Sequence, residues 1–179
     1  MKTIMGVVLV VFALTMGTGC APAKKIWISS PAIQNAGNDY YDAKLEPLTK
    51  AHDFFVSFLL SVTNKTDKDL EIDWNKTRYI LRGRSSGVFV FKGINPEDIK
   101  NATIAPDVIS AGKTFSKVIS PYKLLARAPI RDREKTGSEA GIHPGILPNG
   151  ENGILLVVRQ NGKEIVDKMM VIIEEKKSQ

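Results

Sequence analysis

The strongest constraint on the fold is the dipeptide Asn161-Gly162, which joins two apolar-rich segments at residues 154–160 and 163–173. A two-residue type I′ turn needs positive φ at both central positions, and Asn followed by Gly adopts that backbone most readily. We therefore expect two antiparallel strands joined by a type I′ turn.

A second segment alternates with period two. Apolar side chains occupy every other position in the set Phe54, Val56, Phe58, Leu60 and Val62, and Phe55, Ser57, Leu59 and Ser61 lie between them. Successive side chains of a strand point to opposite faces, so this pattern predicts a long strand with the first set inward. Turn formers at 64–68 and alternation over 70–74 predict that this strand continues into a hairpin.

Short strand-like segments recur at 78–82, 88–92 and 114–119, and no helical period follows the first twenty residues. Seven or eight short strands favour an all-β sandwich, which we place at 41–179 as a single domain. Residues 20–40 hold prolines, glycine and polar residues, a composition typical of a tether. Residues 120–150 lack a clear strand and are predicted to form a long loop.

The N-terminus has the organisation of an export signal. Lys2 precedes an apolar stretch from Ile4 to Met16, which small residues then end. That stretch is shorter than the roughly 20 apolar residues of a transmembrane helix. It predicts a signal peptide at 1–19.

The residues Gly17-Thr18-Gly19-Cys20 resemble the lipobox of bacterial lipoproteins, although Gly17 stands where most lipoboxes carry an aliphatic residue. The resemblance implies cleavage before Cys20 and acylation of its thiol. Cys20 is the only cysteine, so no intramolecular disulfide can form. Ala21 follows the cysteine where lipoproteins of the inner membrane often carry Asp. An outer-membrane location facing the periplasm is therefore implied in a cell with two membranes.

An alternative cleavage site lies three residues further on. Ala21-Pro22-Ala23 fits the A-x-A pattern of ordinary secretion, and cleavage after Ala23 would release a soluble protein. Such a protein would be a carrier of a small ligand held between its sheets. We expect its cavity to be lined by aromatic residues from the set Phe55, Phe58, Phe89 and Phe91.

Three segments make the mature chain similar to the immunoglobulin-like domains of small bacterial lipoproteins. They are Phe58 to Asn64, Asp69 to Ile72, and Pro148 to Ile154 before the Asn-Gly dipeptide. The resemblance implies a single antiparallel immunoglobulin-like sandwich of seven to eight strands. Because such sandwiches serve adhesion, assembly and scaffolding alike, the expected function is a non-catalytic binding or structural module of the cell envelope.

Catalytic and metal-binding residues are not predicted. His52 and His143 are the only histidines, and neither lies in a recognised motif. A small hydrolase would have to use His143 with Glu139 or Asp132, which we regard as a weaker alternative. Acidic residues alternate from Asp67 to Asp73, but no calcium-binding loop follows, so we expect no metal and no cofactor.

The charge pattern points to a protein or glycan partner rather than nucleic acid. The chain has 25 basic and 19 acidic side chains, which are interleaved along the sequence as on a solvated surface. The predicted loop at 120–150 carries Arg127, Arg131 and Arg133. Because guanidinium groups bind carboxylates well, these three arginines are candidate residues for binding an envelope protein or an acidic glycan.

Overall fold

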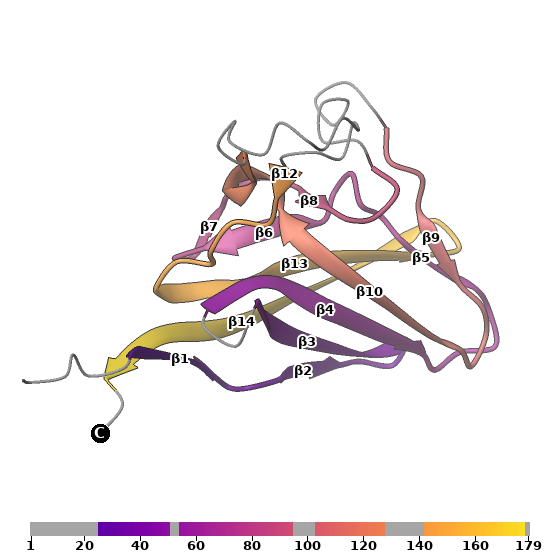
Figure 1. Cartoon of the computed structure of the whole chain (residues 1–179). Coiled ribbons are helices and arrows are strands. Elements are labelled where there is room, and N and C mark those ends of the chain that lie inside the picture. Colours follow the sequence, from indigo (N-terminus) through magenta and orange to yellow (C-terminus); the bar gives the residue numbers. More distant parts are fainter. Residues whose placement is uncertain (1–24, 51–53, 95–102, 128–141, 178–179) are drawn as a thin grey trace, which may run out of the picture.

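The computed structural model describes residues 25–50, 54–94, 103–127 and 142–177 (Figure 1). These residues form two antiparallel sheets and contain no α-helix, so the all-β prediction is confirmed. Within the described ranges, no helix is long and apolar enough to cross a bilayer.

The first sheet has seven strands built around the C-terminal hairpin. Its main order is β1 (Lys25–Ser30), β14 (Lys163–Lys177), β13 (Gly150–Gln160), β5 (Leu70–Ile72) and β9 (Asp107–Ile109). The strand β6 (Arg78–Leu81) pairs with the other half of β13 and with β7 (Arg84–Ser85). At the break between β5 and β6, the Thr77 hydroxyl accepts a hydrogen bond from the Val157 backbone N–H at 3.2 Å. This bond satisfies a β13 donor where the strand ladder is interrupted.

The second sheet has five strands. Their order is β2 (Gln34–Gly37), β3 (Tyr41–Lys50), β4 (Phe54–Asn64), β10 (Thr114–Pro121) and β8 (Phe89–Val90). A separate ladder pairs β11 (Ala126–Arg127) with β12 (Ile142–His143), and the short 3₁₀ helix η2 (Tyr122–Leu124) lies between β10 and β11. The sheets contain more strands than predicted, because several are only two to four residues long.

The predicted C-terminal hairpin is confirmed. Asn161 has φ of 50° and Gly162 has φ of 77°, and Gln160 pairs with Lys163 across the turn. Both central residues therefore have the positive φ that defines a type I′ turn.

The alternation predicted for β4 is confirmed from Phe58 to Val62 and wrong at its start. Phe58, Leu60 and Val62 are fully buried, but the core contains Phe55 rather than Phe54. The register against β3 shifts between Leu48 and Thr49, which leaves one extra residue on β4. Such a bulge reverses the faces of the residues before it.

The predicted tether at 20–40 is too long. Residues 25–30 and 34–37 form β1 and β2, which pair with β14 and β3. Trp27 packs against the core, and this burial makes β1 part of the sandwich despite the polar and proline-containing neighbourhood. The domain therefore begins at Lys25 rather than at residue 41.

The predicted loop at 120–150 is also partly structured. Ser120 and Pro121 still belong to β10, and Gly150 already belongs to β13. The small β11–β12 ladder pairs Ala126 with His143. Only residues 128–141 between these strands lie outside the described residues.

Candidate functional site

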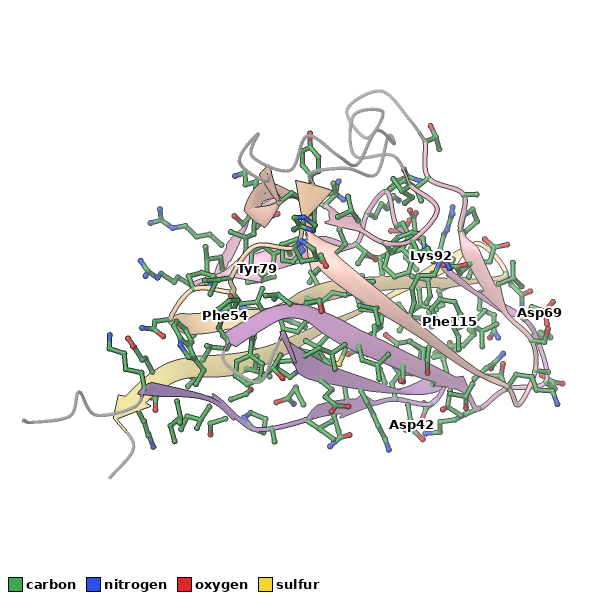
Figure 2. The ribbon with its side chains drawn as sticks, in the orientation of Figure 1. Asp42, Phe54, Asp69, Tyr79, Lys92 and Phe115 are labelled. Carbon is green, nitrogen blue, oxygen red and sulfur yellow. The ribbon has the colours of Figure 1, made fainter. Side chains whose placement is uncertain are left out.

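A polar groove lies at one end of the sandwich, between the β4–β5 loop (residues 65–69) and the β13–β14 hairpin. Its volume is about 490 Å³. It is lined by Lys68, Asp69, Glu71, Arg159, Gln160, Asn161 and Gly162. Figure 2 shows Asp69 at the tip of the molecule that lies furthest from β1. We call this the hairpin groove.

The β4–β5 loop is held in place by a buried asparagine. Asn64 is 1% exposed, and its Nδ2 donates to the carbonyl oxygens of Lys68 at 2.7 Å and of Ile109 at 2.9 Å. Its Oδ1 accepts from the Thr66 backbone N–H at 2.9 Å. These bonds fix one wall of the groove and explain Asn64 as a structural residue of the turn.

A glutamine links the two walls. Gln160 is 8% exposed, and its Nε2 donates to Thr66 Oγ1 at 2.7 Å and to the Lys68 carbonyl oxygen at 3.2 Å. Because Gln160 is the last residue of β13, these bonds tie the hairpin directly to the β4–β5 loop. The groove is therefore built by contacts between segments that are about ninety residues apart in the sequence.

Arg159 supplies the main cation within the groove. Its Nη2 lies 3.5 Å from Asp73 Oδ2 and 3.9 Å from Glu71 Oε2, while its Nε is buried without a hydrogen-bond partner among the described residues. A buried donor left unpaired costs about 1–3 kcal/mol.

The lining determines what kind of ligand fits the hairpin groove. Lys68 and Asp69 are exposed and carry opposite charges, and Asn161 adds an amide. The seven residues that line the groove include no aromatic or aliphatic side chain. The site is therefore suited to a ligand that forms hydrogen bonds and ion pairs, and lacks the apolar walls typical of small-molecule pockets.

A second cluster joins the two sheets near the same end. Lys117 of β10 forms an ion pair with Asp107 of β9, and Trp74 Nε1 donates to the same carboxylate at 2.7 Å. The Lys117 Nζ lies 4.0 Å from the ring centroid of Phe91, with Trp74 at 5.6 Å and Phe115 at 5.3 Å. Figure 2 shows Phe115 between the sheets. Since Lys117 is 23% exposed and Asp107 29%, this cluster connects the sheets through a largely desolvated charge pair.

The residues predicted to bind a partner do not form this groove. Arg127 lies in β11, outside the groove lining, and Arg131 and Arg133 lie outside the described residues. Cys20 also lies outside them. Sequence reasoning noted Asp69 and Glu71 only as members of an alternating acidic run, and it treated Lys68 as a turn residue.

The geometry gives no support to the hydrolase alternative. His143 is exposed, and its side chain forms no hydrogen bond with a described residue. Glu139, Asp132 and His52 lie outside the described residues. In the described part of the chain, no group of three or more His, Cys, Asp or Glu residues is arranged to hold a metal ion.

The aromatic residues expected to line a ligand cavity pack against one another. Phe58 and Phe89 meet edge to face with ring centroids 6.5 Å apart, and Tyr79 lies 6.0 Å from Phe89. Phe91 lies against Trp74 with ring centroids 4.8 Å apart and the ring planes tilted by 51°. These contacts are those of a close-packed core between the sheets.

Comparison with protein-family models, with curated proteins and with solved structures finds no match for this chain.

Proposed function

We propose that this chain is an exported lipoprotein, cut before Cys20 and anchored by lipid on that residue, whose sandwich is a non-catalytic binding module. The apolar segment at 4–16, the residues Gly17-Thr18-Gly19-Cys20 and the absence of any other cysteine support the anchor. The hairpin groove is the binding surface, and its partner is an envelope protein or an acidic glycan.

The observation that carries this proposal is the position of the groove relative to the N-terminal strand. The strand β14 begins at Lys163 beside the groove and ends at Lys177, which pairs with Lys25. At about 3.3 Å per residue, this strand spans roughly 45 Å. Figure 1 shows β1 and the C-terminus at one end of the molecule and the β13–β14 turn at the other. A module anchored through its N-terminus would thus direct the groove away from the membrane.

The strand order supports an immunoglobulin-like sandwich. One sheet contains the order β3-β4-β10-β8, and the other contains β14-β13-β5. In chain order these correspond to the A-B-E-D and G-F-C sheets of an immunoglobulin domain. The groove then lies between the B–C loop and the F–G hairpin, which are the positions of two antigen-binding loops in antibody variable domains. This end of such a sandwich is well suited to recognition because its loops rest on a rigid scaffold.

The anchor is tested by expressing the full chain and a Cys20→Ser variant in a bacterial host. Membranes are fractionated, and the intact mass of the mature protein is measured. We expect the wild type to carry acyl chains at Cys20 and the variant to lack them. If both are soluble and begin at Lys24, the lipoprotein proposal is wrong.

The groove is tested by crosslinking on whole cells. Acylation consumes the only native cysteine, so a Lys68→Cys variant has one free thiol, which is labelled with a photoactivatable maleimide. A Glu174→Cys variant places the same label on exposed β14 at the opposite end. We expect a defined crosslinked species from position 68 and none from position 174. The same products from both positions, or none from position 68, would show that the groove is not the binding surface.

A further inference from the structure

The end of the sandwich opposite the groove has an unusual shape. The ladder between β13 and β14 ends where Gly150 pairs with Ile173, whereas residues 174–177 continue and pair with β1. Residues 25–28 and 174–177 therefore form a two-stranded extension beyond the body of the sandwich, which we call the N-terminal ribbon. Figure 1 shows it at the lower left, beside the C-terminus.

The ribbon and the adjoining sheet expose apolar side chains on one face. Val171 and Ile173 are fully buried, so Ile172 and Lys176 point to the outer face of the sheet. Ile26 pairs with Lys176 and shares that face. Ile26 is 41% exposed and Ile172 is 44% exposed. Half-buried Trp27 follows Ile26 on the same strand and points to the opposite face, where it packs against the core.

Both basic and acidic side chains lie around these isoleucines. Lys25, Lys176, Arg82 and Arg84 are all exposed. The Arg82 backbone N–H donates to the Glu151 carbonyl oxygen, and Glu151 pairs with Ile172, so the β6–β7 turn lies level with Ile172. Glu175 and Glu174 form ion pairs with Lys25 and Lys176, while Arg82 and Arg84 form none with a described residue. Glu151 is also exposed, lies beside Ile172 and forms no ion pair with a described residue, so the two arginines leave this end with an excess of one positive charge.

The ribbon begins very close to the residue proposed to carry lipid. Only four residues lie between Cys20 and Lys25, so the distance between these two residues is at most about 17 Å when the chain is fully extended. A headgroup layer is about 5–8 Å thick. The anchor therefore holds the ribbon at the level of the headgroups or immediately above them.

We propose that the N-terminal ribbon, with Ile172 and the β6–β7 turn, is a surface that contacts a bilayer containing anionic lipid. Exposed isoleucines partition into the interface between headgroups and acyl chains, and arginines bind the phosphates. This inference rests on the proposed anchor at Cys20. It goes further by assigning the face that meets the membrane.

A tryptophan at position 26 provides a direct test in a Trp27→Phe background, because Trp74 is then the one other tryptophan and is 2% exposed within the sandwich. The lipidated Ile26→Trp/Trp27→Phe protein is purified from membranes and reconstituted into vesicles of phosphatidylcholine with phosphatidylglycerol, using lipids brominated near the headgroup end of the acyl chain. We expect bromine to quench the fluorescence of this protein. The Trp27→Phe variant alone should not be quenched.

Two variants test the residues assigned to the surface. In the Ile26→Trp/Trp27→Phe protein, we expect Ile172→Asp combined with Arg82→Glu to reduce quenching at least twofold. The control Val108→Asp changes a more exposed apolar residue on β9, away from the ribbon, and should leave the quenching unchanged.

The intact mass of the reconstituted protein shows whether Cys20 carries lipid, and so distinguishes a failure of the anchor from a failure of the membrane-contacting surface. If Cys20 carries no lipid, both the anchor and this inference are wrong. If Cys20 is lipidated but the tryptophan at position 26 is not quenched, or if Ile172→Asp with Arg82→Glu leaves the quenching unchanged, the anchor stands and the membrane-contacting surface is refuted.

Discussion

Asp107 is the residue whose removal should best reveal how the two sheets are held together. It lies on β9 of the seven-stranded sheet and receives both the Lys117 ammonium of β10 and the Trp74 indole N–H. In an Asp107→Ala variant, Lys117 keeps its three aromatic neighbours and loses its counter-ion. The indole N–H loses its acceptor in a place that is poorly hydrated.

The magnitude follows from two terms. The lost hydrogen bond from Trp74 to a charged group is worth about 1.5–3 kcal/mol. The ion pair, with both side chains less than a third exposed, adds about 1 kcal/mol, since exposed pairs contribute less and fully buried pairs more. We expect Asp107→Ala to lower the free energy of unfolding by about 2.5–4 kcal/mol.

A double-mutant cycle with Lys117→Met isolates the ion pair. Methionine keeps a long apolar side chain against the three rings, and it needs no counter-ion. The double variant should therefore be more stable than the sum of the single effects predicts, by about 1–2 kcal/mol. The assay is urea unfolding at neutral pH, followed by Trp74 fluorescence and by circular dichroism.

The control is the ion pair between Lys76 and Glu164, whose side chains are 55% and 38% exposed. Glu164→Ala should change the stability by less than about 0.5 kcal/mol. If Asp107→Ala is equally mild, or if the cycle is additive within about 0.3 kcal/mol, the cluster does not hold the sheets together and our reasoning is refuted.

Three further predictions concern the core and the groove wall. Asn64→Ala should lower the free energy of unfolding by about 2 kcal/mol, because its amide satisfies two carbonyl oxygens; an unchanged urea midpoint would contradict this role. Gly153→Ala should be destabilising by several kcal/mol or prevent folding, because a Cβ would lie 2.1 Å from the Met169 carbonyl oxygen; a soluble variant with wild-type melting temperature would exclude that close approach. Burial raises the pKa of both Tyr41 and Tyr79, and a hydrogen bond to Asp167 adds to the effect at Tyr41. Because the folded-state pKa lies above the unfolded value of about 10, the stability that these phenols contribute is complete below pH 10 and falls at higher pH, by up to about 1.4 kcal/mol per pH unit for each tyrosine. Unfolding measured from pH 8 to 11 should show a weaker decline in a Tyr41→Phe/Tyr79→Phe variant, and an identical slope would contradict the assignment.

The parts of the fold that the sequence predicted are those decided by local chemistry. The type I′ turn at Asn161 needs only two adjacent residues with the right φ preferences, and the alternation from Phe58 to Val62 needs only the pleat of one strand. The error at Phe54 has a different origin. The bulge in β4 depends on its register with β3, and no pattern within β4 alone shows it.

The tether predicted at 20–40 was too long for the same reason, because strand formation there depends on contacts with distant parts of the chain. Pro31 and Gly37 made residues 20–40 resemble a linker, but β1 and β2 become strands because β14 and β3 offer free edges beside them. Strand formation at an edge depends on a partner that lies far along the chain. Local composition does not show that partner.

The hairpin groove was missed for a related reason. Lys68 and Gln160 are turn and strand-end residues, and only the register of β13 with β5 brings the two segments together. The candidate binding residues were instead predicted in residues 120–150, because that segment has the length of a functional loop. The Lys117 cluster did leave a signal, since Lys117 occupies an inward position between Phe115 and Ile119 on an alternating strand. A charge at such a position indicates a buried partner.

The architecture gives the proposed module a fixed orientation. The strand β14 is continuous from the groove to the N-terminal ribbon, and it is paired along its length by β13 or β1. In the anchored state that we propose, only four residues lie between Cys20 and β1, so the ribbon lies close to the membrane. Because β14 is paired along its length, the groove lies at a fixed distance from the ribbon. A long tether would let the groove sample every direction, whereas this short one restricts it to a shell at roughly 45 Å from the headgroups. A partner at that height would meet a groove that is already oriented toward it, which lowers the entropic cost of binding.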